Sequence, residues 1–317
     1  MSAERATAVV VTYNSAAHIG TTLAALRGGA SDIVVVDNAS TDDTTTIVRL
    51  DAPDVTLIAN GVNVGFAAAV NQALATVRNP IVLLVNPDCT VPAATSRGLV
   101  RFLIDEPGAA IAGPRLVDPA GRVAISAHPF ESLSSVVLSR FGGSLVPVGV
   151  RRIVSRSKRR AAYDACRSSV EPVAVEWLSG ACLAVRADVL RTVGGLDERY
   201  FLYYEDEELC WQAHRLGRHV FYVPGLTATH VGGASSETGA TWPHLYRSML
   251  VFFASHRRSS YQAVRGVVLL RAGLGVAMGA ARRAVGGRGG SARVLAWRRV
   301  AGIAWTSSRL ELAEVVP

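Results

Sequence analysis

Asp88 follows the most strand-like segment of the chain. The apolar run Ile81–Val85 stops at Asn86, Pro87 and Asp88, which is the pattern of a strand buried on both faces. Ligands of open α/β sheets bind outside the carboxyl ends of the strands, and Mg²⁺ and Mn²⁺ prefer carboxylate oxygens. Asp88 is therefore a candidate ligand for a cation that neutralises a diphosphate, although a turn aspartate after a strand would give the same pattern.

His230 is a second candidate metal ligand. A lone histidine is more often structural, but a neutral imidazole can bind Mn²⁺ or Mg²⁺ where carboxylates are scarce. The amide residue Asn86 makes them scarce beside Asp88. We therefore expect His230 to complete the site.

A run of four acids begins at Glu205 and follows two tyrosines. The spacing of Leu209, Ala213 and Leu216 predicts a helix that buries this face and leaves Asp206, near its start, facing a cleft. Acids in a first turn also stabilise a helix through its dipole, which is the alternative explanation of the run. A carboxylate in a partly buried aromatic setting can accept a proton from a hydroxyl. Asp206 is our first candidate for this base and Glu205 the second.

Polar residues also follow two earlier strand-like segments. They are Thr12, Tyr13 and Asn14 after the first segment, and Asp37 and Asn38 after the second. Such strand ends line nucleotide crevices, where a carboxylate can accept a hydrogen bond from the N–H of a uracil or thymine ring. Asp37 is the candidate for that contact. An Asx turn leading into a helix capped by Ser40 is an equally good reading of this residue alone.

A third nucleotide-binding segment begins at Asn63. Gly65, Phe66 and a small-residue helix start follow it, with Asn71 further along the helix. Glycine and alanine let a backbone approach a ligand closely, and helix N-termini favour negative charge. We expect these residues, together with Asn86, to contact a nucleotide or its phosphates.

The order of elements predicts an α/β fold with a mostly parallel sheet flanked by helices, because strands and helices alternate. The expected strands are Ala8–Thr12, Ile33–Asp37, Val55–Ile58, Ile81–Val85 and Ala109–Gly113, and the helices between them Thr21–Leu26, Thr44–Leu50, Ala67–Val77 and Ala94–Ile104. After about Pro114 the alternation fades, and we expect Arg151–Arg160 to form a mobile loop. Order resumes with strand-like Val173–Val185 and a helix over Asp206–Leu216 that Gly217 ends.

Charge is unevenly distributed along the chain. The net charge is +8, but the segment Thr238–Leu310 holds twelve arginines and no acid, which leaves −4 for the rest. Within it, Tyr246–Arg283 mixes apolar residues and arginines in the manner of a helix that lies in a membrane interface with arginines at the headgroups. A solvated basic helix is the alternative. We expect no spanning helix, because Arg271 splits the apolar run. Four widely spaced cysteines indicate a reducing cytoplasm.

Several passages together resemble the family-2 inverting glycosyltransferases with the GT-A fold. They are VVVTYN at 9–14, VVVDNAS at 34–40, NVGFAAAVN at 63–71, NPD at 86–88, and WLSGACLAVRADVL and GGLDERYFLYYEDEELCWQ within 177–212. Within that family the chain is most similar to bacterial rhamnosyltransferases that act on lipid-linked cell-wall acceptors. The resemblance implies a GT-A domain over residues 1–237, followed by a basic helical extension over 238–317.

The resemblance also implies roles for residues. Asp37 would contact the pyrimidine, Asp88 and His230 would bind Mg²⁺ or Mn²⁺, and Asp206 would be the catalytic base. Contacts with the donor or acceptor sugar would come from Trp177, Ser179, Gly180 and Glu207. The family more often has an aspartate where this chain has Asn86, which puts metal affinity in question.

The implied activity is inverting transfer of a sugar, L-rhamnose from dTDP-L-rhamnose, to a polyprenyl-diphosphate-linked or polysaccharide hydroxyl. The alternatives are transfer from another UDP, dTDP or GDP sugar, a nucleotidyltransferase of similar fold, or a non-catalytic membrane or nucleic-acid docking protein. The sequence contains no lysine-bearing phosphate loop of the kind expected in a nucleotidyltransferase, because Lys158 is the only lysine. This argues against the nucleotidyltransferase. We expect a peripheral enzyme on the cytoplasmic face of a bacterial plasma membrane that binds anionic lipid and no nucleic acid.

Overall fold

The computed structural model describes residues 5–141, 164, 166–232, 239–284 and 290–307. The loop predicted at residues 151–160 lies outside these ranges. The chain divides into two units, one of residues 1–130, 158–198 and 205–232, the other of residues 131–157, 199–204 and 233–317. The second unit thus includes two segments that precede the boundary expected after residue 237.

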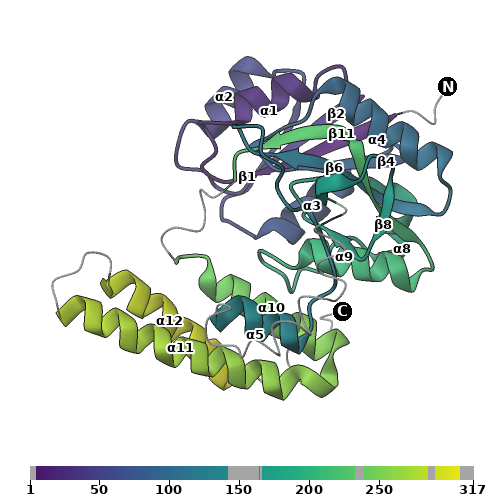
Figure 1. The fold of residues 1–317 in the computed structure, drawn as a ribbon. Coiled ribbons are helices and arrows are strands. Elements are labelled where there is room, and N and C mark those ends of the chain that lie inside the picture. The colour runs from purple at the N-terminus through teal and green to yellow at the C-terminus, as the bar shows by residue number, and fades with distance from the viewer. Residues whose placement is uncertain (1–4, 142–163, 165, 233–238, 285–289, 308–317) are drawn as a thin grey trace. The chain divides into compact units, whose positions relative to one another are not determined.

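The first unit is built on a mixed sheet of nine strands (Figure 1). Its strands are β1 (Ala6–Thr12), β2 (Asp32–Asp37), β3 (Thr56–Ala59), β4 (Ile81–Val85), β5 (Cys89–Thr90), β6 (Ala109–Val117), β8 (Val173–Val175), β10 (Cys182–Arg186) and β11 (His219–His230). The spatial order is β3-β2-β1-β4-β10-β6-β11-β5, with β8 paired to β11. The first four strands in this order are parallel, and β10 is antiparallel to both its neighbours. A separate two-stranded sheet pairs β7 (Ala127–His128) with β9 (Trp177–Leu178).

Helices cover both faces of the large sheet, and this explains the continuous apolar runs of its central strands. They are α1 (Ile19–Leu26), α2 (Thr44–Asp51), α3 (Phe66–Leu74), α4 (Ala93–Asp105), α8 (Ala187–Val193) and α9 (Glu205–Arg215). One face packs against α1, α2 and α4, and the other against α3, α8 and α9. In β4, Ile81, Leu83 and Val85 point to the first face, and Val82 and Leu84 to the second. The predicted strand Ile81–Val85 has these same bounds.

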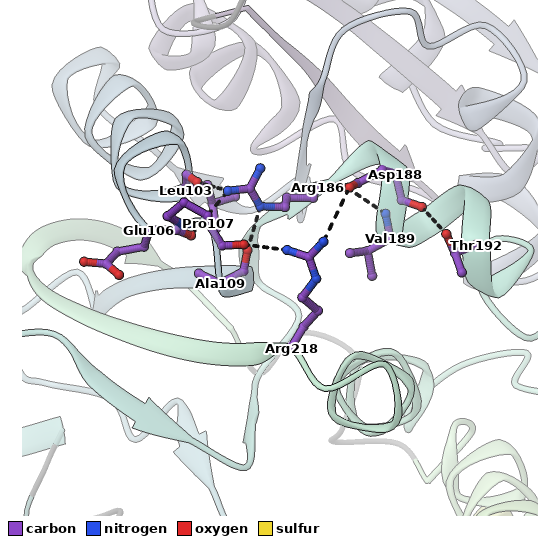
Figure 2. A network of polar contacts seen from close by, with 9 residues as sticks. All are labelled: Leu103, Glu106, Pro107, Ala109, Arg186, Asp188, Val189, Thr192 and Arg218. Atoms are coloured by element: carbon purple, nitrogen blue, oxygen red, sulfur yellow. Dashed lines mark hydrogen bonds and ion pairs between the residues drawn. The ribbon is translucent and has the colours of Figure 1, made fainter.

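Arg186 holds the sheet to the end of α4 (Figure 2). Its guanidinium donates to the carbonyl of Leu103 and, at 2.7 Å, to the carbonyl of Ala109. The last carbonyls of a helix have no partner within the helix, so an arginine there satisfies them. Beside it, Arg218 donates to the carbonyl of Pro107 and lies 4.0 Å from Asp188. This network is at the amino end of β4, because Arg186 pairs with Ile81.

Strand β11 carries an irregularity in the middle of its length. It pairs with β6 in parallel, but the register shifts between Val223 and Thr227. Pro224 and Gly225 lie in this β-bulge, as expected for residues that suit a ladder poorly. Thr95 fixes the far side of the bulge, since its hydroxyl donates to the carbonyl of Thr227 at 2.7 Å.

The second unit is helical. It contains α5 (Leu133–Phe141), α10 (Trp242–His256), a short 3₁₀ helix η1 (Arg258–Ser260), α11 (Tyr261–Ala284) and α12 (Gly290–Thr306). Figure 1 shows α11 and α12 side by side. Gly275 makes this packing possible, since a Cβ there would lie 2.4 Å from the Trp297 ring.

Among the described residues, Arg258–Arg282 is long and apolar enough to cross a membrane, judged by length and composition alone. The expectation that Arg271 excludes such a helix is too strict. That side chain is satisfied within the second unit, where it donates to the carbonyl of Arg140 at 3.0 Å and lies 4.4 Å from the Trp297 ring centroid.

Candidate active site

Asp37 ends β2 with only 2% of its surface exposed. Its Oδ1 accepts hydrogen bonds from Thr12 Oγ1 at 2.8 Å and Ser40 Oγ at 2.5 Å, and its Oδ2 accepts from the Ser40 backbone N–H at 2.9 Å. The cap predicted from Ser40 is wrong, because Asp42 is the residue that accepts from the N–H of Thr44 at the start of α2. The carboxylate of Asp37 is thus fixed at the strand end, and its contact with a base stays a prediction.

The loops after β1 and β2 are joined in an uncommon backbone conformation. Asn14 and Ala39 have φ of 51° and 60°, a region that non-glycine residues rarely adopt. Asn14 Oδ1 accepts from the N–H of Thr41, and its own N–H donates to Ser40 Oγ, both at 2.8 Å. Tyr13 beside it is 53% exposed, so its ring is open to a ligand. Asn14 therefore shapes this wall, and Tyr13 is placed to touch a nucleotide.

The segment before α3 is shaped by two amides. Asn38 Nδ2 donates to the carbonyl of Gly65 at 3.1 Å, and Asn63 Oδ1 accepts from the N–H of Gly65 at 3.0 Å. Gly65 has φ of 90°, which glycine adopts without strain. Phe66 packs partly buried against the core. The predicted nucleotide residues here define the backbone path of the loop.

Asn71 holds a more distant loop in place. Its Oδ1 accepts from the N–H of Leu196, and its Nδ2 donates to the carbonyl of Leu196, both at 2.8 Å, and to Glu198 Oε1 at 2.9 Å. Both kinds of polar atom in the amide are used within the protein. Asn71 therefore holds the loop that contains Leu196, and the nucleotide contact predicted for it stays a prediction.

Asp88 and His230 are brought together by the pairing of β5 with β11. In that pairing Cys89 lies opposite His230, although the two are far apart in the sequence. Asp88 Oδ1 lies 3.2 Å from His230 Nε2, and Asp88 Oδ2 accepts from the N–H of Gly232 at 3.1 Å. Both side chains keep some exposure, 20% and 25%. The two predicted metal ligands are thus neighbours at one edge of the sheet.

The environment of Asp88 favours its charged form. Burial alone would raise the pKa of this carboxyl, but the hydrogen bond and charge of His230 and the N–H of Gly232 outweigh it, so the pKa lies below its ordinary value. An ionised carboxylate and an imidazole nitrogen suit a divalent cation. Among the described residues, no group of three or more acidic, histidine or cysteine side chains is arranged so that it could hold a metal ion. A cation held by Asp88 and His230 would therefore keep positions for phosphate oxygens and water.

Asp206 lies in the first turn of α9, and its carboxylate accepts hydrogen bonds from two backbone N–H groups. Gly180 donates to its Oδ2 and Glu207 to its Oδ1, both at 2.8 Å. Burial raises the pKa of Asp206, and these two N–H groups oppose that rise. The predicted helix begins one residue earlier than expected, at Glu205, and Leu216 is 42% exposed rather than buried.

Glu205 differs from its neighbour because its Oε2 is buried without a hydrogen-bond partner. Burial, and then the charge of Asp206, raise the pKa of Glu205 to about 8. The two carboxyls thus have separate characters near neutral pH: Glu205 holds its proton, whereas Asp206 has the donors that support a charge. This favours Asp206 over Glu205 as the base.

Glu207 is 2% exposed. A side chain so deeply covered has almost no surface for a ligand. Glu207 is thus buried in the structure, and the sugar contact predicted for it stays a prediction.

The loop before β10 connects the two acids at this edge. Gly180 donates to Asp206, and the next residue, Ala181, accepts at its carbonyl from the N–H of Asn86 at 3.0 Å. A Cβ on Gly180 would lie 3.3 Å from the Cβ of Asp206, so a larger residue would press on it. One short loop therefore positions both Asp206 and the segment that carries Asp88.

The small β7–β9 sheet adds His128, a residue that the sequence did not suggest. The ring of His128 stacks on Trp177 with centroids 4.5 Å apart and planes at 27°. Its Nε2 lies 3.4 Å from the hydroxyl of Ser179, the residue before Gly180. Trp177, Ser179 and His128 are all partly exposed. Only the pairing of His128 with Trp177 reveals this platform, since no motif surrounds the histidine.

Residues 7–157 match the family described as Glycosyl transferase family 2. A curated protein of Mycobacterium tuberculosis, N-acetylglucosaminyl-diphospho-decaprenol L-rhamnosyltransferase, is 30% identical over 288 residues, which cover 84% of this chain and 91% of that protein. The chain belongs to glycosyl transferase family 2. It is a glycosyltransferase, and the nucleotidyltransferase and docking-protein alternatives are set aside.

Solved structures with the same fold include a mannosyltransferase. The mannosyltransferase PcManGT of Pyrobaculum calidifontis, solved with GDP-Man and Mn²⁺, aligns with a TM-score of 0.54 at 17% identity over 95% of this chain and 86% of its own. GalNAc-T7, solved with UDP, GalNAc and Mn²⁺, aligns with a TM-score of 0.55 at 15% identity over 82% of this chain and 51% of its own. The predicted GT-A fold class is confirmed.

The candidate site residues lie in two parts of the sequence. The family match contains Asp37 and Asp88, whereas Asp206 and His230 lie beyond residue 157. The structure places His230 beside Asp88 and ties Asp206 to the same edge through Gly180. The candidate site residues thus come from within the matched segment 7–157 and from beyond it.

Proposed function

We propose that this glycosyltransferase moves L-rhamnose from dTDP-L-rhamnose to a hydroxyl of a polyprenyl-diphosphate-linked sugar, with inversion at the anomeric carbon. The observation that carries the proposal is the 30% identity to the Mycobacterium tuberculosis rhamnosyltransferase over most of both chains. The edge that joins Asp88, His230 and Asp206 supports it, because such a transfer needs a site for a diphosphate beside a base.

The mechanism begins with Asp206 acting as the base. Asp206 accepts the proton of the acceptor hydroxyl, whose oxygen forms a bond to the anomeric carbon as the bond to the diphosphate breaks. The bonding electrons leave with the nucleoside diphosphate. The N–H groups of Gly180 and Glu207 hold the carboxylate in place throughout, and positioning of this kind lowers the barrier without extra chemistry.

A divalent cation, Mg²⁺ or Mn²⁺, belongs to this proposal. Asp88 Oδ1 and His230 Nε2, 3.2 Å apart, are the donors that would hold it. When bound, such a cation supplies positive charge that stabilises a leaving diphosphate. The solved mannosyltransferase and GalNAc-T7 structures, both solved with Mn²⁺, support a divalent metal in this fold.

The location proposed for the enzyme is the cytoplasmic face of the bacterial plasma membrane. A polyprenyl-linked acceptor is confined to a membrane, and the C-terminal segment with twelve arginines and no acid is suited to anionic lipid. Fractionation of cells that produce the chain should recover it with membranes and release it in high salt or alkaline carbonate. Recovery in the soluble fraction at low salt would contradict this location.

The donor is tested by a panel of nucleotide sugars. Purified protein is incubated with a polyprenyl-diphosphate N-acetylglucosamine acceptor, Mn²⁺ and dTDP-L-rhamnose, or a UDP, dTDP or GDP hexose. We expect a new lipid-linked disaccharide from dTDP-L-rhamnose, with the anomeric configuration opposite to that of the donor by NMR. Equal or better transfer from another donor would overturn the assignment of rhamnose while leaving the glycosyltransferase assignment intact.

A further inference from the structure

Helix α11 has one face that is exposed to solvent and free of charge. Between residues 266 and 281 its exposed residues are Gly266, Leu270, Gly273, Leu274, Ala277, Met278, Ala280 and Ala281. Leu270, Leu274 and Met278 are 59%, 43% and 57% exposed and follow one another at four-residue spacing. We call these eight residues the apolar face. Over 16 residues it extends for about 24 Å along the helix.

Arg265 and Arg271 of α11 do not lie on this face. Arg265 donates to the carbonyls of Ala304 and Trp305 in α12. Arg271 donates to the carbonyl of Arg140 and stacks on Trp297. The expectation that these two arginines reach lipid headgroups is therefore wrong, because both are bonded within the second unit. Their contacts leave the exposed side of the helix apolar between residues 266 and 281.

Exposed arginines lie near the two ends of α11 and on the neighbouring helix α12. Arg258 precedes α11, Arg282 stands near its end, and both are exposed. On α12, which packs along α11, Arg293, Arg298 and Arg299 are exposed together with Leu295 and Trp305. An apolar strip on α11, together with exposed arginines near its ends and exposed arginines and a tryptophan on α12, suits the surface of an anionic bilayer, in which acyl chains lie beneath negative headgroups.

We propose that α11 lies in the plane of an anionic membrane, with Leu270, Leu274 and Met278 inserted at the level of the acyl chains. The helix is long enough to cross a bilayer, but its inner side is packed against α12. Crossing would take Arg298 and Arg299 into the hydrocarbon, where arginine is strongly disfavoured. An in-plane orientation avoids this cost.

Vesicle flotation of the full-length chain tests the proposal. The vesicles contain equal parts of phosphatidylglycerol and phosphatidylcholine, or phosphatidylcholine alone. We expect flotation with the anionic vesicles, and we expect Leu270→Gln and Leu274→Gln each to weaken binding about ten-fold. The control is Leu50→Gln, which changes a leucine that is 74% exposed on α2 in the first unit and should float like the unchanged protein.

Other results would overturn the proposal. Unchanged flotation of the double variant Leu270→Gln/Leu274→Gln would show that the apolar face is not inserted. A dimer in light scattering that the same variant dissociates would identify the face as an interface between two copies. Protein that stays with vesicles in alkaline carbonate would indicate a spanning helix.

Two further measurements separate this inference from folding and from the activity. Circular dichroism checks that each variant is folded, and Arg298→Gln/Arg299→Gln should reduce flotation at low salt without touching the apolar face. The inference does not depend on the proposed donor, because flotation needs no sugar transfer. Transfer to a short-chain, water-soluble acceptor should be unchanged in Leu270→Gln, so lost flotation with retained transfer supports the membrane role alone.

Discussion

Replacing Asp206 by asparagine should abolish sugar transfer while sparing the fold and the donor site. Asparagine keeps the size of the side chain but cannot accept the proton of an acceptor hydroxyl. A positioned general base contributes about 10²- to 10⁴-fold to a rate, which corresponds to about 3 to 5 kcal/mol of activation free energy. We therefore expect kcat to fall by that factor.

The structure also sets the cost of this change to stability. Asp206 accepts one N–H on each oxygen, from Gly180 and from Glu207. Asparagine has one acceptor oxygen, so one N–H loses its partner at a cost of about 1 to 3 kcal/mol. Removal of a charge that burial disfavours offsets part of this cost. The free energy of unfolding should fall by less than about 2 kcal/mol.

The assay combines transfer kinetics with calorimetric titration of dTDP in the presence of Mn²⁺. Asp188→Asn is the matched control, because it makes the same chemical change outside the candidate site. Asp188 lies in the network around Arg186, and its carboxylate is 4.0 Å from the guanidinium of Arg218 (Figure 2). Transfer by Asp206→Asn within ten-fold of the unchanged enzyme would refute the base assignment. Loss of dTDP binding together with transfer would show instead that Asp206 shapes the nucleotide site.

Four other changes test separate parts of the structure. Asp88→Asn should weaken Mn²⁺-dependent binding of dTDP about 100-fold in calorimetry and leave metal-independent binding unchanged, because a metal ligand is lost. Glu205 has its pKa raised from 4.5 to about 8, so the folded state holds a proton that the unfolded state releases between these values. The free energy of unfolding in urea should therefore fall as the pH rises through this window, and Glu205→Gln should remove the slope. His128→Ala should raise the acceptor KM about five-fold with little change in kcat, whereas His219→Ala, at the far end of β11, should change neither. Arg186→Ala should lower the free energy of unfolding by about 3 kcal/mol in urea, because the carbonyls at the end of α4 lose their donor.

The elements of the first unit were largely predictable because each reflects a local pattern. The run Ile81–Val85 is apolar at every position, and the structure buries all five residues in β4. Gly217 ends α9 as expected, with φ of 70° and N–H groups that return to the last turn. Such signals depend on neighbours in the sequence, so the sequence alone expresses them.

The partners of side chains were harder to predict, because they depend on strand pairing across long separations. Asn71 and Asp88 both looked like ligand residues. Strand pairing places Asp88 beside His230, whereas the side-chain amide of Asn71 donates hydrogen bonds to Leu196 and Glu198. His128 gave no signal at all, since its meaning comes from Trp177 across the small sheet.

The direction of the arginines in the C-terminal helices was misread for a related reason. The sequence shows that arginines interrupt the apolar residues of α11, but it does not show which side of the helix meets α12. Arg265 and Arg271 face backbone carbonyls and an indole ring. Main-chain acceptors leave no trace in a sequence, so this orientation could be found only from the structure.

The irregularity in β11 sets the position of His230 beside Asp88. The segment Thr227–His230 follows the register shift, and its last residue carries the imidazole that lies beside Asp88. Successive side chains of a strand point to opposite faces and advance about 3.3 Å per residue. Three residues, Pro224, Gly225 and Leu226, lie between Val223 and Thr227, whose partners Pro114 and Arg115 are adjacent in β6. If β11 instead continued the regular ladder of its first half past Val223, His230 would lie three positions further along β6. Because three is an odd number, its ring would then point to the other face of the sheet. The irregularity therefore decides which face of the sheet receives the imidazole.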